Sequence, residues 1–461
     1  MENTANLKKK KPLFLRLARY LFTLYMITLY IFVDRVETVI ISKMVFVLYA
    51  GFCALVILQR KRLHIGKNML VAYMVITWMY ATSFWAKHEY LASEKMGTMW
   101  QVFILFFITY NVFSEEEDAH EYLIKSLYIS GIVLVVYSIR TYGFSQVIDM
   151  MSEAGGVRLG REINQENTFG MYNATTVMVA FYYLLYRNRF KLFHIAVIAM
   201  SFLFAMSSGS RKALLMMCIG VLFLIYKRYG IKKLYKVVII TAILIFIFMM
   251  VIKLPIFNLI NRRLELAVEM LQGESKGDGS ARTRFKMISD GWEIFKERLL
   301  IGYGANNYAY VSGYWTYAHN NFIEMLVDFG LIGFILYYLV YALAMNNLLR
   351  SKKDAGKALL AIFMVRFLME IALVTYYSKQ TWILMAFFLI SDRAFEQHYE
   401  EDEELTEYDI ENSEEKSENI RDVIEKFLEE EKGERYEPED DYVESEESTL
   451  ESGAFIADPV E

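Results

Sequence analysis

Blocks of apolar residues about as long as a membrane-spanning helix recur along most of this 461-residue chain, separated by short charged segments. A helix needs about 20 apolar residues to cross a bilayer, whereas a soluble core would show amphipathic stripes instead. With 55% hydrophobic residues and four prolines, the pattern favours an all-α polytopic membrane protein. We predict twelve spans, near residues 13–33, 38–58, 68–86, 96–113, 121–142, 168–186, 190–208, 211–227, 235–253, 319–345, 356–376 and 380–392.

Lysine and arginine predict which loops face the cytoplasm, because they gather on that side of a membrane protein. With Lys8–Lys11 inside, the alternate loops that follow are basic, and only the acidic segment Glu115–Asp118 breaks the pattern. Both termini are then cytoplasmic. The external segments are 143–167, the turn Ser207–Arg211, and one large loop of residues 254–318 between the ninth and tenth spans.

The end of the chain differs sharply in composition from the rest. From Ser391 to Glu461 there are 29 acidic and 6 basic residues. Such a segment buries too little apolar surface to fold alone, so we expect an acidic, disordered cytoplasmic tail. The predicted organisation is a cytoplasmic N-terminus (1–12), a transmembrane domain (13–392) and the tail (393–461).

Several classes of function are disfavoured. Cys53 and Cys218 both lie within apolar runs, which argues against a disulfide framework or a cysteine-based metal site. No glycine-rich phosphate loop of the nucleotide-binding type occurs. We therefore expect neither an activated nucleotide nor a nucleic acid as a partner.

Arginines stand at the predicted external ends of spans. Arg211 ends the sequence Ser-Ser-Gly-Ser-Arg at a span start, where the helix dipole disfavours a cation. Its planar fork matches phosphate oxygens, and the exposed backbone N–H groups of the turn, beside Ser210, also suit an anion. Interfacial snorkelling of Arg211 is an equally good explanation.

Two further external segments carry arginines. Arg158 and Arg161 are three residues apart and would share a face if that segment were helical. A solvated basic loop is the simpler interpretation. The long loop contains the remaining candidates, which are Arg282 and Arg284, a possible amphipathic segment through Trp292, and Gly302-x-Gly304, where the backbone could turn tightly or approach a ligand.

His319 is the candidate base, with a capping or interfacial histidine as the alternative interpretation. It begins the tenth span, and its imidazole titrates in a range suited to proton transfer. Asn320, Glu324 and Asp328 follow at intervals of four, so they would lie on one helical stripe. Carboxylates within a span usually face a cavity or a partner. These residues together suit a lipid-linked phosphate or pyrophosphate donor and an acceptor hydroxyl that needs a base.

These residues, in this order and spacing, resemble the O-antigen ligase and polymerase superfamily of bacterial cell-surface polysaccharide synthesis. The resemblance covers residues 200–335 closely and 13–392 more loosely. It departs from the family pattern at Glu297-Arg-Leu-Leu300, where a proline usually precedes the G-x-G, and at Lys212, where a small residue is frequent. The residues that carry it are Ser208-Gly-Ser-Arg211, Arg284, Gly302-x-Gly304, His319-Asn320, Glu324 and Gly330-Leu-Ile-Gly333.

The resemblance implies a metal-independent glycosyltransferase without a cofactor. It would act on undecaprenyl-pyrophosphate-linked glycans at the external face of the cytoplasmic membrane and polymerise them into a capsule, exopolysaccharide or O-antigen. Arg211 and Arg284 would hold the donor pyrophosphate, with Arg158 and Arg161 assisting. His319 would activate the acceptor hydroxyl, and Glu324 would orient His319 or be structural. Supporting roles would fall to Ser210, Arg282, Gly302, Gly304 and Asn320.

Two alternatives remain open from the sequence. A ligase would use the same donor site and pass the glycan to another acceptor. A transporter or flippase of lipid-linked glycans would instead carry deep charges in several spans and inverted repeats. Besides membrane lipids, the acidic tail could bind other polysaccharide-assembly proteins.

Overall fold

The chain folds into a bundle of apolar helices in the computed structural model, which describes residues 11–153, 157–187, 189–271, 279–391 and 421–422. No strand occurs among these residues. Residues up to Phe395 form one compact unit. The tail predicted to be disordered lies outside the described residues, apart from Arg421 and Asp422.

Each predicted span overlaps a helix, although the helix within the predicted span 356–376 ends at Met369. Prolines are kept out of helix interiors, where they would break the hydrogen-bond ladder: Pro12 caps the first helix, and Pro255 opens a short 3-10 turn. The α-helices are α1 (Leu13–Ile31), α2 (Val39–Arg60), α3 (Lys67–Ala81), α4 (Glu89–Phe113), α5 (Ala119–Tyr142), α6 (Phe144–Ser152), α7 (Glu166–Tyr186), α8 (Lys191–Ser207), α9 (Arg211–Tyr229), α10 (Leu234–Ile252), α11 (Asn258–Leu271), α12 (Gly279–Glu297), α13 (Tyr308–Val311), α14 (Asn321–Arg350), α15 (Asp354–Met369) and α16 (Lys379–Phe388).

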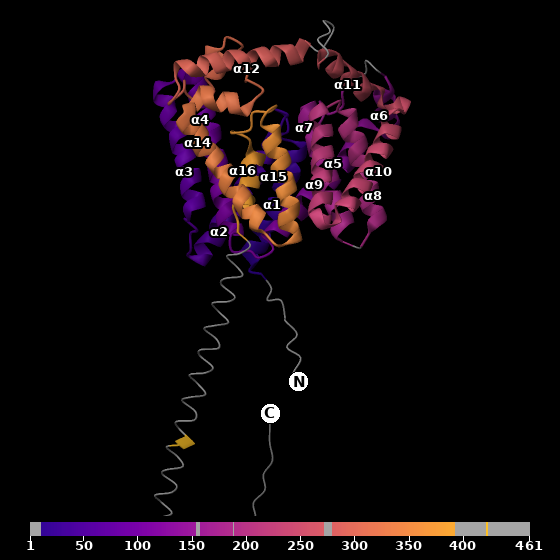
Figure 1. The fold of residues 1–461 in the computed structure, drawn as a ribbon. Helices are drawn as coiled ribbons and strands as arrows, with labels where there is room; N and C mark the ends of the chain where they lie inside the picture. The colour runs from indigo at the N-terminus through magenta and orange to yellow at the C-terminus, as the bar shows by residue number, and fades with distance from the viewer. Residues whose placement is uncertain (1–10, 154–156, 188, 272–278, 392–420, 423–461) are drawn as a thin grey trace, which may run out of the picture. The chain divides into compact units, whose positions relative to one another are not determined.

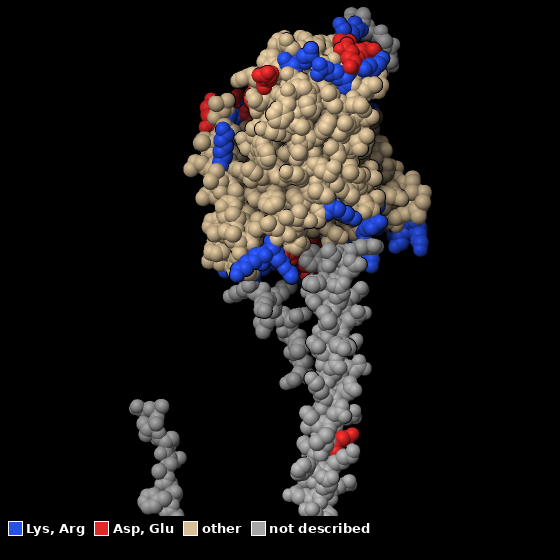
Figure 2. Space-filling view, turned by 90° about the vertical axis from the view of Figure 1, so that its left-hand side faces the viewer, with Lys and Arg blue, Asp and Glu red and all other residues tan. Residues whose placement is uncertain are grey.

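Within the part of the chain that the structure describes, six helical segments are long and apolar enough to cross a membrane. The space-filling view shows a broad face of uncharged side chains between charged groups at the two ends of the bundle (Figure 2). Both observations are as expected of a polytopic membrane protein, while the count of twelve crossings stays a prediction. The six segments are Leu13–Ile31, Val39–Arg60, Glu89–Phe113, Ala119–Tyr142, Ile231–Ile252 and Asn321–Arg350.

The acidic segment that broke the charge pattern is neutralised by its neighbours. Arg19 contacts Glu116 at 3.0 Å and Asp118 at 2.6 Å, and Lys11 pairs with the same two carboxylates. Arg60 contacts Glu116 at 2.7 Å. The segment therefore lies at the same end of the bundle as these basic residues. Its negative charge is consistent with the predicted topology.

The predicted long loop is largely helical. It contains α11, α12 and α13, and α12 lies across the end of the bundle in Figure 1. The amphipathic segment predicted through Trp292 is part of α12, with Phe295 buried and Trp292 47% exposed.

A break in α14 anchors this region to the bundle. Gly330 has φ of 65°, outside the helical range. The carbonyl groups and N–H groups freed there are used by the preceding loop: Gly304 N–H donates to Asp328 O at 2.8 Å, and Leu331 N–H donates to Leu299 O at 2.8 Å. An interrupted span is stable only when its backbone groups find partners within the protein. Here the loop that contains Gly302 supplies them.

Candidate functional site

Ser207–Arg211 forms a tight, buried turn before α9. Ser210 caps the helix by accepting a hydrogen bond from Ala213 N–H at 3.3 Å, as short hydroxyl side chains do at helix starts. Arg211 then donates to the backbone carbonyl of Arg263 on α11 at 3.4 Å. The turn thus fixes the position of Arg211 as the first residue of α9. Ser210 has a structural role as the cap of this helix.

Arg158 lies against the same turn. Its Nε donates to Ser208 O at 2.7 Å, and its Nη2 donates to Asn167 Oδ1 at 2.8 Å. Arg263 approaches from the other side: a β-carbon placed on Gly209 would lie 3.1 Å from Arg263 Cδ and 3.4 Å from Arg158 Nε. Three arginines from distant parts of the sequence therefore meet around one turn.

Arg284 and Lys212 complete what we call the cation cluster, defined as Arg158, Arg211, Lys212, Arg263 and Arg284. All five side chains are half-buried. Burial and the neighbouring positive charge of Arg263 lower the pKa of Arg158. The negative charge of Glu166 raises this pKa in part, and the positive charge of Arg284 lowers it further. Half-buried positive charges that repel one another favour an anion with several oxygens, such as phosphate.

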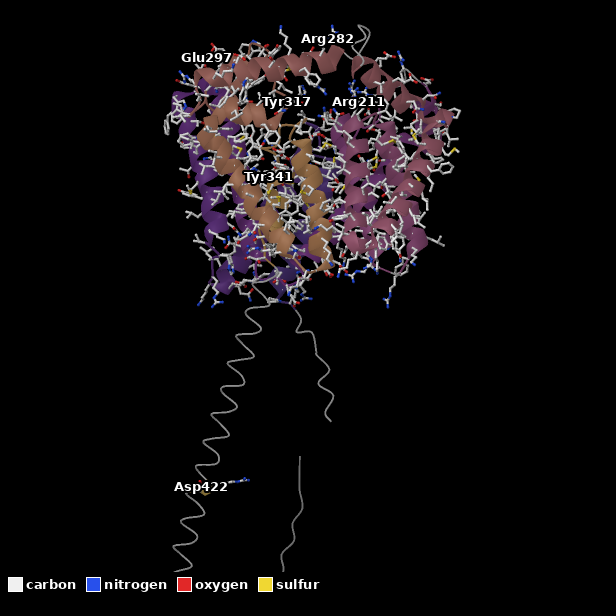
Figure 3. The ribbon with its side chains drawn as sticks, viewed as in Figure 1. Arg211, Arg282, Glu297, Tyr317, Tyr341 and Asp422 are labelled. Carbon is white, nitrogen blue, oxygen red and sulfur yellow. The ribbon has the colours of Figure 1, made fainter. Side chains whose placement is uncertain are left out.

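Two predicted arginines lie at the edge of this cluster. The side chain of Arg161 is 83% exposed and contacts Glu166 at 3.3 Å. The helix that would place Arg158 and Arg161 on one face does not form, because Gly160 between them has φ of 129°. Arg282 is exposed near the start of α12, and Figure 3 shows it at the same end of the bundle as Arg211.

His319 occupies a strained turn directly before α14. Its φ is 55°, a left-handed conformation that costs a residue with a side chain on the order of 1 kcal/mol. Glu324 helps to hold the turn by accepting a hydrogen bond from Ala318 N–H at 2.6 Å. The imidazole lies against the ring of Tyr317, with 4.2 Å between ring centroids. Glu324 therefore acts on the backbone beside His319, as a positioning role requires.

The turn is also tied to the segment between α15 and α16. Asn320 caps α14 by accepting from Ile323 N–H at 3.0 Å, and its Nδ2 donates to Ile371 O at 3.0 Å. Asn321 N–H donates to Glu370 O at 2.8 Å. The Asn321 side chain donates to the Glu370 carboxylate at 2.5 Å and accepts from Thr375 N–H at 2.9 Å. These hydrogen bonds hold the two residues that directly follow His319.

The cation cluster perturbs His319 electrostatically. Burial, together with the positive charges of Arg284 and Lys212, lowers the pKa of His319 to about 4. The imidazole is thus neutral around pH 7 and able to accept a proton. A neutral base beside several cations is an arrangement that can bind an anionic leaving group and deprotonate an attacking hydroxyl.

The glycine pair is used structurally. Gly302 has φ of 65°, and a β-carbon there would lie 2.5 Å from Asp328 O. The backbone at Gly302 therefore approaches the backbone of α14 closely. Asp328, fully buried, accepts from Asn306 N–H at 2.8 Å and Tyr308 N–H at 2.7 Å. Glu324 and Asp328 share the predicted helical stripe, whereas Asn320 stands outside the helix as its cap.

The sequence interpretation missed three residues of this arrangement. Arg263 lies in a segment interpreted as loop, although its neighbours Leu259 and Ile260 follow a helical apolar pattern in α11. Lys212 was noted only as a departure from the family pattern, yet its charge acts on His319. Asn167 was given no role from the sequence, yet its side chain accepts a hydrogen bond from Arg158.

Comparison with known proteins finds a family model that matches part of the chain. Residues 195–338 match the family model described as O-antigen ligase. This part of the chain is similar to an O-antigen ligase domain. This match confirms the resemblance to the O-antigen ligase and polymerase superfamily, and no curated protein matches the chain. The O-antigen ligase domain contains four members of the cation cluster, together with His319 and Glu324, while Arg158 and Glu370 lie outside the matched residues.

Proposed function

We propose that this protein is a membrane glycosyltransferase that polymerises oligosaccharide repeat units carried on undecaprenyl pyrophosphate. The observation that carries the proposal is the neutral His319 beside the cation cluster. The O-antigen ligase domain supports a glycosyltransferase of this family. We further propose that the site faces the exterior of the cytoplasmic membrane, with both termini inside, and that the product is a capsule, exopolysaccharide or O-antigen.

In the proposed reaction an acceptor sugar hydroxyl attacks the anomeric carbon of the donor glycan. The new carbon–oxygen bond forms as the bond from that carbon to the pyrophosphate oxygen breaks. The hydroxyl proton passes to His319, and the lipid pyrophosphate leaves with the bonding electrons. Arg211 and Arg284 stabilise the charge that develops on the leaving group, since preorganised cations act most strongly where charge appears.

The transfer to a different acceptor, as in a ligase, would need the same donor site. A flippase would require charged groups open to a transport path. Glu324, Asp328 and Glu370 instead accept hydrogen bonds from within the protein. This favours a fixed catalytic site over a transport path.

Reconstitution tests the proposal. Purified protein in liposomes receives a lipid-pyrophosphate oligosaccharide, and the products are separated by length. A polymerase gives a ladder, whereas a ligase gives a single transfer to an added acceptor. Transport of the donor without a new glycosidic bond would refute both.

Variants then assign the roles. His319→Asn removes the base while keeping a residue that tolerates positive φ, so we expect transfer to fall by 10²-fold or more, the usual contribution of a general base. Arg284→Lys keeps the charge but loses the planar fork and should also impair transfer. Lys286→Gln, an exposed position on the same helix, is the matched control. Normal product length from His319→Asn would contradict the base assignment.

A further inference from the structure

A polar cavity lies at the end of the bundle opposite to the cation cluster. The start of α7 is at the cation cluster, where Asn167 contacts Arg158. The end of α7 is at this cavity, which is lined by Tyr182, Tyr183 and Arg187. A helix of 21 residues is about 30 Å long, so the cavity is remote from His319. It has a volume of about 510 Å³ and lies between the starts of α1 and α5 and the end of α7.

The walls of this cavity carry an excess of positive charge. Two carboxylates, Asp118 and Glu121, face five cations: Lys11, Arg16, Arg19, Lys125 and Arg187. Arg19 and Lys11 both contact Asp118, and Arg187 contacts Glu121 at 2.6 Å.

The excess comes from two residues. Arg16 and Lys125 are exposed and have no ion-pair partner among the described residues. They extend from two different helices into the same space, and Tyr20 completes that wall with a phenol. Cations on separate helices that line one cavity can contact different oxygens of one phosphate group.

The apolar surface next to the cavity suggests the rest of the ligand. Tyr20 is 70% exposed and Leu24 is 44% exposed; four residues apart on α1, they form one outward face. α1 is a candidate membrane span, so we expect this face to meet acyl chains. A ligand with its phosphate in the cavity and a hydrocarbon chain along α1 would satisfy both surfaces.

We propose that this cavity binds the phosphate headgroup of an anionic phospholipid. Basic pockets between transmembrane helices on the cytoplasmic side are suited to such headgroups. The site is separate from the glycan site and its occupant is a component of the surrounding bilayer.

Native mass spectrometry of the full chain, delipidated in detergent and titrated with phosphatidylglycerol or phosphatidylcholine, tests this. We expect the wild-type protein to retain phosphatidylglycerol preferentially. Arg16→Gln with Lys125→Gln should weaken retention roughly 30-fold, equivalent to about 1 kcal/mol for each charge. Arg62→Gln with Lys67→Gln removes two exposed cations outside the cavity and should change retention little.

Three results would overturn the proposal. The first is equal retention of phosphatidylglycerol by the cavity double variant and the wild type. The second is an equal loss in the control double variant, which would show general surface attraction. The third is full competition by glycerol phosphate at concentrations matching the lipid, which would show a soluble-anion site. Monodisperse elution of each variant establishes that it is folded.

Discussion

Replacing Arg284 with glutamine is expected to raise the pKa of His319 in the protein without substrate. Burial and the charges of Arg284 and Lys212 lower that pKa to about 4, against an ordinary value near 6.5. At pH 6.5 an unperturbed imidazole is half protonated, whereas one with a pKa of about 4 is protonated in roughly one molecule in 300. Losing one of the two cations should move the pKa part of the way back.

The pKa can be measured without activity. Diethyl pyrocarbonate modifies neutral imidazole, and peptide mass spectrometry separates His319 from the other five histidines. The modification rate should fall with a midpoint near pH 4 in the wild type and at higher pH in Arg284→Gln. Lys286→Gln should keep the wild-type midpoint. A wild-type midpoint at 6.5, or no change in Arg284→Gln, would refute the electrostatic reasoning.

The same electrostatics predicts a difference between two pH profiles of transfer. The profile of kcat/KM reports the free enzyme, and that of kcat reports the substrate complex. A bound pyrophosphate would offset the charges of Arg284 and Lys212, so it should raise the pKa of His319. The acidic limb should therefore lie near pH 4 for kcat/KM and at higher pH for kcat. Donor binding would thereby strengthen the base it needs.

Further predictions concern stability and positioning. Gly302→Ala should lower the thermal midpoint more than Gly313→Ala does, because both have positive φ but only the first would collide with the backbone of α14. Glu370→Gln should lower kcat for transfer with little change in donor KM, since it disturbs the turn beside the base while leaving the cation cluster intact; an unchanged kcat would contradict this role. Arg19→Met should destabilise by about 1–3 kcal/mol in denaturant titrations, because it removes hydrogen bonds to charged carboxylates while Lys11 and Arg60 still contact Glu116. Exposed Arg62→Met should stay within about 0.5 kcal/mol.

Apolar run length predicted the helices well, because the sequence carries that signal locally. The helix at residues 379–388 shows the limit: the predicted span ran to 392, whereas α16 ends at Phe388. The long loop was harder, since α11 and α12 are amphipathic and too polar for a span criterion. Their apolar spacing was present in the sequence, but nothing local specified that they would lie over the bundle.

The site was predicted in part. Arg211, Arg284 and His319 stand in a recognisable order, and the structure brings Arg284 close enough to His319 to lower its pKa. Arg263 could not be selected from the sequence, because its position depends on how α11 packs. The tie from Asn321 to Glu370 spans 49 positions, and no pattern in a single sequence reveals a pair so distant.

That tie bears on the order in which the protein is made. The turn containing His319 leaves the ribosome well before Glu370, Ile371 and Thr375, which hold it in place. Until those later residues have entered the membrane, the turn lacks these hydrogen bonds and keeps the one from Ala318 N–H to Glu324. A nascent chain can therefore expose its arginines early, but it acquires an aligned base only when its last helices are inserted.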